Sequence, residues 1–240
     1  MSTYIPSLAL QGTIERIKNP PKVLNTKNEL VQRDYEHHVG TWACTKLKEI
    51  FSDNSWAITP EQKDPNTNKK PDLVVEKAIP GPIVTLKLHL AMELKKKNKR
   101  MEDALVQLSD SLKETIENMG LDHPDQYEIF AVVQSGLDIG FFEYHLDESN
   151  LDEEGIPHFR GCVSLTYDYY VKGRQQVPIQ NKPNDLKNLF FDFDKLKKNT
   201  DIRSDAKNYP IPCIFNLENH SQEINAIFQY MEKNMPRSSW

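Results

Sequence analysis

The spacing of hydrophobic residues alternates between a helical period and a strand period along the chain, and these changes predict its elements. In residues 28–51 apolar side chains recur every three to five positions, which predicts a helix with one buried face. Residues 56–59 predict a short strand. A second helical pattern covers residues 101–119, and Gly120 and Pro124 follow it as stop signals.

The longest strand pattern lies in residues 83–95, where the even positions are apolar. Because side chains alternate faces along a strand, Glu93 and Lys95 are expected to point the same way. Residues 72–77 form a second alternating run, separated from the first by the turn-forming sequence Ile79-Pro80-Gly81-Pro82. Residues 127–133 and 139–145 predict two more strands. The expected order is therefore helix, three strands, helix, two strands.

The rest of the chain is less regular. Residues 1–27 predict an N-terminal arm or a short early helix, ahead of a core at residues 28–145. Residues 146–240 form a C-terminal extension that we expect to pack on this core within the same domain. Within the extension we predict an acidic solvated loop at 146–157, a strand at 161–171, local packing around residues 186–196 and a helix at 218–234. The spacing of the acidic residues does not match a calcium-binding loop.

Composition limits the number of domains, the partners and the cellular compartment that we expect for the protein. With 240 residues, 38% of them hydrophobic, the chain can form the core of one elaborated domain. A net charge of −5 means that a nucleic acid would have to be bound by a local basic patch. The sequence shows neither a membrane-spanning run nor a secretory signal, and its three cysteines form no CxxC pair. We therefore expect an intracellular protein, in the cytoplasm or nucleus, with no membrane partner.

The candidate chemistry lies on the predicted hairpin. If the turn is centred between residues 82 and 83, Asp72 lies opposite Glu93, with β-carbons about 4.5–5.5 Å apart. Two carboxylates at that separation repel one another unless a cation lies between them, and Mg²⁺ prefers such hard oxygen ligands. A metal can activate water and neutralise phosphodiester charge, while the nearby ammonium of Lys95 orients that water. This set of residues is suited to hydrolysis.

Pro71-Asp72, followed after twenty residues by Glu93-Leu94-Lys95, resembles the PD-(D/E)xK motif of the restriction-endonuclease-like nuclease superfamily. The resemblance implies an α/β fold with a mixed central sheet flanked by helices. It also implies hydrolysis of DNA or RNA with Mg²⁺ or Mn²⁺ held by Asp72 and Glu93. Glu36 in the first helix and Gln107 in the helix after the motif resemble supporting residues of that superfamily. The other Pro-Asp pair and the other ExK of the chain do not complete the motif in the right order.

A basic segment follows the motif directly. We interpret it as a rim that grips nucleic-acid phosphates, formed by Lys96, Lys97, Lys99 and Arg100. A solvated connection or a nuclear-import signal would produce the same pattern.

Three histidines accompany these residues. His37 and His38 lie in the first helix, where some viral cap-snatching endonucleases of this fold place a metal-binding histidine. The position of His38 at the edge of the apolar face favours a packed or hydrogen-bonded side chain instead. His89 is expected on the Glu93 face, in a cross-strand pair with Glu76.

Two functional hypotheses follow. The first is a metal-dependent nuclease that hydrolyses phosphodiester bonds. The second is a catalytically inactive protein of the same fold that acts as an interaction or effector module. The sequence leaves open the polymer, the mode of cutting and whether the protein forms a homodimer.

Overall fold

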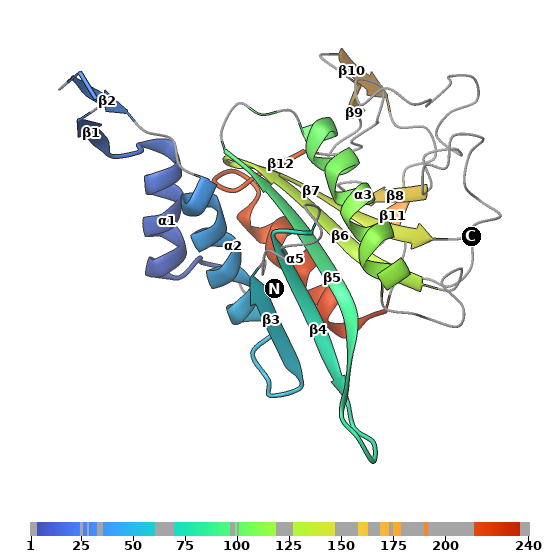
Figure 1. Ribbon diagram of the computed structural model, residues 1–240. Coiled ribbons are helices and arrows are strands. Elements are labelled where there is room, and N and C mark those ends of the chain that lie inside the picture. Colours follow the sequence, from blue (N-terminus) through green and yellow to red (C-terminus); the bar gives the residue numbers. More distant parts are fainter. Residues whose placement is uncertain are drawn as a thin grey trace.

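A computed structural model of the protein (Figure 1) describes residues 4–24, 26–27, 29–32, 36–60, 70–96, 99, 101–118, 127–146, 158–162, 169–172, 175–178, 190–191 and 214–235. The helices within these ranges are α1 (Leu8–Lys18), α2 (Glu36–Ile50), α3 (Met101–Asn118) and α5 (Ser221–Lys233). The strands are β1 (Lys22–Leu24), β2 (Leu30–Gln32), β3 (Trp56–Pro60), β4 (Leu73–Ile79), β5 (Thr85–Lys95), β6 (Tyr127–Ser135), β7 (Asp138–Leu146), β8 (His158–Cys162), β9 (Tyr169–Lys172), β10 (Gln175–Pro178), β11 (Phe190–Phe191) and β12 (Phe215–Asn216).

The main sheet is mixed. Its strands run in the order β11-β8-β7-β6-β5-β4-β3, and β12 pairs with β7 outside this path. All pairs are antiparallel except β5 with β6, which are parallel because α3 crosses between them. The predicted α/β class, with its order of helix, three strands, helix and two strands, is confirmed in the described residues.

Helices cover both faces of the sheet (Figure 1). Helices α1, α2 and α5 contribute Ile14, Trp42 and Phe228 to one hydrophobic cluster, with Leu90 of β5 and Phe141 of β7 from the sheet. Helix α3 packs on the other face and buries its own apolar stripe, which comprises Met101, Ala104, Leu105, Leu108 and Leu112. The first cluster therefore joins segments from both ends of the chain.

A buried lysine ties these segments together. Lys46 of α2 is 1% exposed, and its Nζ donates hydrogen bonds to Asn225 Oδ1 of α5 (2.6 Å) and to Tyr4 Oη (2.8 Å). Burial lowers the pKa of Lys46 to about 8, while the nearby Glu49 carboxylate acts in the opposite direction. The two polar acceptors offset part of the cost of removing this charge from water.

Two predicted elements were wrong in extent. The first helix begins at Glu36 rather than at residue 28, because Leu30–Gln32 pairs with Lys22–Leu24 as an antiparallel ribbon. The predicted strand at 161–171 is two strands in different sheets: β8 pairs with β7, whereas β9 pairs with β10. Strand β10 begins three positions after β9 ends, a separation typical of a β-hairpin. Strand β9 therefore pairs with β10, its neighbour in the sequence, and not with a strand of the main sheet.

The acidic loop was predicted to begin at residue 146, which is the last residue of β7; the rest of that loop and most of the segment 186–196 lie outside the described residues. The predicted C-terminal helix is present as α5. In the part of the chain that the structure describes, no helix combines the length and the apolar character needed to span a bilayer.

The packing of helix α5 against the sheet can be tested by substituting Phe228. Phe228 is fully buried, and its ring centroid lies 5.1 Å from that of Phe141 in β7. We expect Phe228→Ala to lower the free energy of unfolding by about 3–5 kcal/mol, because it removes apolar contacts and leaves a cavity. Urea denaturation measures the change. The neighbouring Gln229 is exposed, so Gln229→Ala should change stability by less than about 0.5 kcal/mol. Equal effects of the two variants would contradict the packing of α5.

Candidate functional site

Two acidic residues lie where β4 begins and β5 ends. Leu73 pairs with Met92, and continuing this register by one position sets Asp72, just before β4, across from Glu93 of β5. The Leu94 amide donates a hydrogen bond of 2.6 Å to Asp72 Oδ2, which fixes the Asp72 side chain against the edge of β5. The register expected from the sequence therefore holds at this end of the hairpin.

Lys95 forms an ion pair with one of these carboxylates, that of Glu93. Its Nζ lies 2.5 Å from Glu93 Oε1, and the Glu93 side chain is 0% exposed. Met92 and Leu94 belong to the cluster under α1, α2 and α5, so Glu93 between them faces the side of α3. Alternation along β4 places Asp72 on this side as well, since Leu73 belongs to the opposite cluster.

The donor set fits a hard divalent cation. Carboxylate oxygens from two adjacent strands are the ligands that Mg²⁺ and Mn²⁺ prefer, and Mg²⁺ usually takes one or two carboxylates and completes its shell with water and phosphate oxygens. Among the described residues no cluster of three or more His, Cys, Asp or Glu side chains has the geometry of a metal site. A cation here would therefore rely on Asp72 and Glu93 as its protein ligands.

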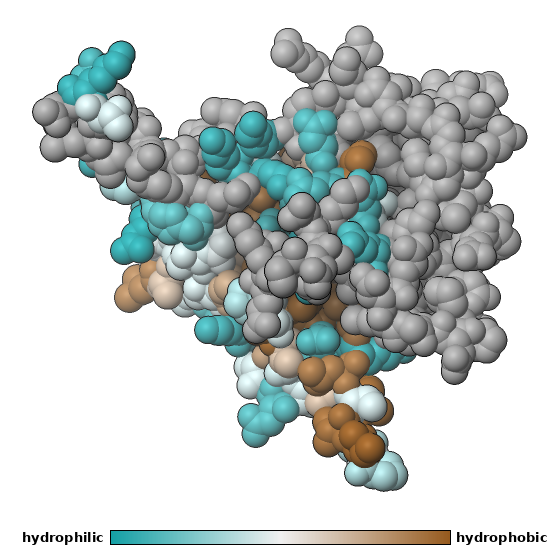
Figure 2. All heavy atoms as spheres, viewed as in Figure 1, coloured by the Kyte–Doolittle hydropathy of each residue, from teal (hydrophilic) through white to brown (hydrophobic). Residues whose placement is uncertain are grey.

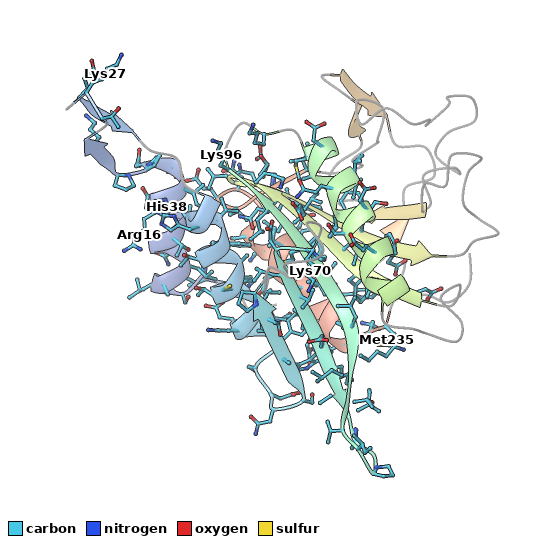
Figure 3. All side chains as sticks on the ribbon, in the orientation of Figure 1. Arg16, Lys27, His38, Lys70, Lys96 and Met235 are labelled. Atoms are coloured by element: carbon cyan, nitrogen blue, oxygen red, sulfur yellow. The ribbon has the colours of Figure 1, made fainter. Side chains whose placement is uncertain are left out.

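The predicted supporting residues lie in different surroundings. Glu36 is the first residue of α2, whose first turns approach the end of β5: a β-carbon added at Gly40 would lie 3.7 Å from Leu94 Cδ1. His38 is buried and its ring packs against His37, with centroids 4.1 Å apart. Figure 3 labels His38 on α2, and Lys96 just after β5. Gln107 lies on the exposed side of α3.

The basic segment is held by a residue that the sequence analysis missed. Ser135 of β6 donates its hydroxyl toward the carbonyl oxygens of Lys99 (2.7 Å) and Lys96 (3.3 Å). The Gly136 amide also donates to the Lys95 carbonyl (2.9 Å). Only the parallel pairing of β5 with β6 brings Ser135 opposite Lys95, and no local pattern signals that contact.

The three lysines and one arginine proposed as a rim are only partly described. Lys96 and Lys99 are exposed beside the carboxylates, whereas Lys97 and Arg100 lie outside the described residues. Both described lysines therefore lie just after the end of β5.

The prediction for His89 was wrong. The ladder shifts between Val75 and Glu76, so Glu76 pairs with Leu88 instead of His89. This irregularity turns His89 away from the Glu93 side, and the ring lies among Phe51, Trp56 and Phe130. His89 Nε2 contacts the Met231 carbonyl of α5 at 2.7 Å, which requires Nε2 to donate.

Comparison of the chain with protein-family models, with curated proteins and with solved structures finds no match.

The buried position of His89 predicts a pH dependence of stability. Burial lowers the pKa of His89 from 6.5 to about 4. The hydrogen bond to the Met231 carbonyl acts in the opposite direction and raises this pKa, but by less. The unfolded chain therefore takes up this proton first as the pH falls below about 6.5, and stability is lost down to about pH 4. We expect the free energy of unfolding to fall by about 3 kcal/mol over that window from this residue alone.

Urea denaturation across this pH range tests the effect. His89→Phe should reduce the pH slope of the unfolding free energy, whatever its effect on absolute stability. Gln229 is exposed and has no ionisable group, so Gln229→Ala should leave the slope unchanged. An unaltered slope in His89→Phe would contradict the assignment.

Proposed function

We propose that the protein is a metal-dependent nuclease of the restriction-endonuclease-like superfamily. The observation that carries this proposal is the position of Asp72 beside Glu93 on one face of the hairpin, with the Lys95 ammonium against the Glu93 carboxylate. The mixed sheet supports it, because the hairpin with the motif lies in the interior of the strand order. If the charged residues of this hairpin only faced solvent, Glu93 would be exposed. Instead Glu93 is fully buried and paired with Lys95.

The roles of the residues follow from their chemistry. Asp72 and Glu93 would hold Mg²⁺ or Mn²⁺, which when bound supplies charge neutralisation on the phosphodiester and a lowered pKa for water. Lys95 donates hydrogen bonds only, so it can orient an attacking water and stabilise negative charge on a phosphate oxygen. The hydrogen bond from the Leu94 amide keeps Asp72 oriented toward β5. Glu36 and Gln107 are proposed as supporting residues.

Substrate contact is proposed at the end of β5. Lys96 and Lys99 present exposed ammonium groups there, and phosphate contacts of this kind supply most of the affinity for nucleic acids. The hydroxyl of Ser135 donates to the backbone carbonyls of both residues, so the backbone of these two lysines is fixed relative to β6. The substrate is thus a DNA or RNA strand whose phosphates run past these lysines.

The first test is cleavage. Asp72→Asn and Lys95→Gln should each reduce Mg²⁺- or Mn²⁺-dependent cleavage by about 100-fold or more, because each removes charge from the reacting centre. Plasmid, linear duplex, single strands and RNA, incubated in parallel, provide the readout. Lys48 is exposed on α2, so Lys48→Gln serves as the matched control and should keep full activity. Undiminished cleavage by both Asp72→Asn and Lys95→Gln would overturn the proposal.

Metal binding separates the nuclease from an inactive protein of the same fold. A cation at about 100 times its dissociation constant should stabilise the fold by about 2.7 kcal/mol and raise the Tm by several degrees. Differential scanning fluorimetry with Mg²⁺ and Mn²⁺ measures this shift. Asp72→Asn and Glu93→Gln should abolish it. If the wild-type protein shows no shift with either metal, the inactive interaction module becomes the better account.

A further inference from the structure

The β4–β5 hairpin extends beyond its neighbours in the sheet (Figure 1). Strand β3 pairs with β4 no further than Lys77, and β6 pairs with β5 only from Leu90 onward. Past these positions Ala78 pairs with Leu86 and Ile79 with Thr85, and residues 80–84 close the turn. We call residues 78–86 the hairpin tip. Apart from the Ala78 amide, which donates to the Ser55 carbonyl (2.7 Å), the hairpin tip is supported by its own ladder.

The hairpin tip is apolar and exposed. Its aliphatic side chains are accessible to 80% in Ile83, 65% in Val84, 54% in Leu86 and 40% in Ile79. Figure 2 shows these side chains as a brown group at the end of the projection. The tip contains no charged residue. Such a surface is favourably transferred out of water, in proportion to the apolar area that it exposes.

Two lysines stand directly behind the hairpin tip. Lys77 and Lys87 pair with each other across the ladder, one from each strand. Lys87 is exposed, and Lys77 Nζ lies 5.1 Å from the centroid of the Trp56 ring. The nearest carboxylate on either strand, Glu76, is half-buried and one position further from the tip. The Asp53 carboxylate, in the segment before β3, interacts electrostatically with Lys77. The projection therefore has an uncharged apex and a base with two lysines, of which Lys87 is the one on the exposed strand position.

We infer that the hairpin tip inserts into the interfacial region of an anionic phospholipid bilayer. Apolar side chains that bind at this interface enter it by about 5–10 Å, which two rungs and a turn can span. The ammonium groups of Lys77 and Lys87 then lie at the level of the anionic headgroups.

The tip suits a bilayer better than other partners. Four partly exposed aliphatic side chains offer roughly a few hundred Å², whereas each partner of a stable protein complex buries about 800 Å². Nucleic-acid affinity comes from Lys and Arg contacts to phosphate, and the apex carries none. The expectation of no membrane partner rested on the lack of a spanning segment and a secretory signal, and interfacial insertion needs neither.

Backbone rigidity favours insertion. Pro80 and Pro82 restrict the turn, and a β-carbon on Gly81 would lie 3.2 Å from the Ile83 carbonyl oxygen. A pre-ordered loop loses less conformational entropy on binding than an unrestricted one. The inference is independent of the proposed nuclease function, since Asp72 and Lys95 lie at the opposite end of the hairpin.

Vesicle sedimentation tests the inference with the 240-residue chain. The wild-type protein should bind vesicles of phosphatidylserine and phosphatidylcholine more tightly than vesicles of phosphatidylcholine alone. The double variant Ile83→Asn/Val84→Asn should bind about tenfold or more weakly, since both side chains leave water on insertion. Lys87→Gln should weaken binding to the anionic vesicles about fivefold. These positions are exposed, so the variants should fold, and urea denaturation checks this.

Leu8 provides the matched control. It is an aliphatic residue at the start of α1 that is 85% exposed, and Leu8→Asn should leave vesicle binding unchanged. The inference is overturned if the wild-type protein does not bind anionic vesicles, if Leu8→Asn weakens binding as much as the tip variant, or if neutral vesicles bind equally well. Loss of duplex DNA binding by Ile83→Asn/Val84→Asn, with no vesicle binding by the wild type, would reassign the tip to nucleic acid.

Discussion

The antiparallel pairing of β4 with β5 determines the positions of Asp72 and Glu93 at one end of the hairpin and of the hairpin tip at the other. Its register at Leu73 and Met92 sets Asp72 beside Glu93. The same ladder, after a shift at Val75 and Glu76, carries the hairpin tip past the neighbouring strands. One ribbon therefore has a charged, enclosed end and an apolar, exposed end. Because residues on a strand are related by a fixed rise, a change of register at one end would displace the groups there together.

Buried charge is handled differently in three places. Glu93 is compensated by the adjacent ammonium of Lys95. Lys46 donates hydrogen bonds to neutral oxygens of Tyr4 and Asn225 and lies 3.8 Å from the Glu49 carboxylate, and burial lowers its pKa to about 8. His89 instead remains uncharged among aromatic rings, with a depressed pKa. The difference follows from what each side chain meets: a charge is stable in the interior only where an opposite charge or several oriented dipoles are close.

Agreement between the sequence patterns and the structure is greatest where an element is long and its apolar positions are regular. Helix α3 and strand β5 have sustained periods, and both are present within one or two residues of the expected bounds. Leu30–Gln32 was assigned to a helix because a three-residue strand is too short to establish a period of two. The bulge that redirects His89 has no signature in the local sequence, since the partner strand decides where an extra residue is accommodated.

The sequence by itself determined the alternation of polar and apolar residues on the hairpin, and hence that Glu93 and Lys95 share a face. It also determined that the residues from Ala78 to Leu86 are uncharged. Tertiary structure decided which contacts those residues make: Ser135 against the Lys96 and Lys99 carbonyls, His89 against α5, and the exposure of the hairpin tip. The physical reason is that periodicity is a property of one segment, whereas burial and pairing depend on segments far away in the chain that pack against it.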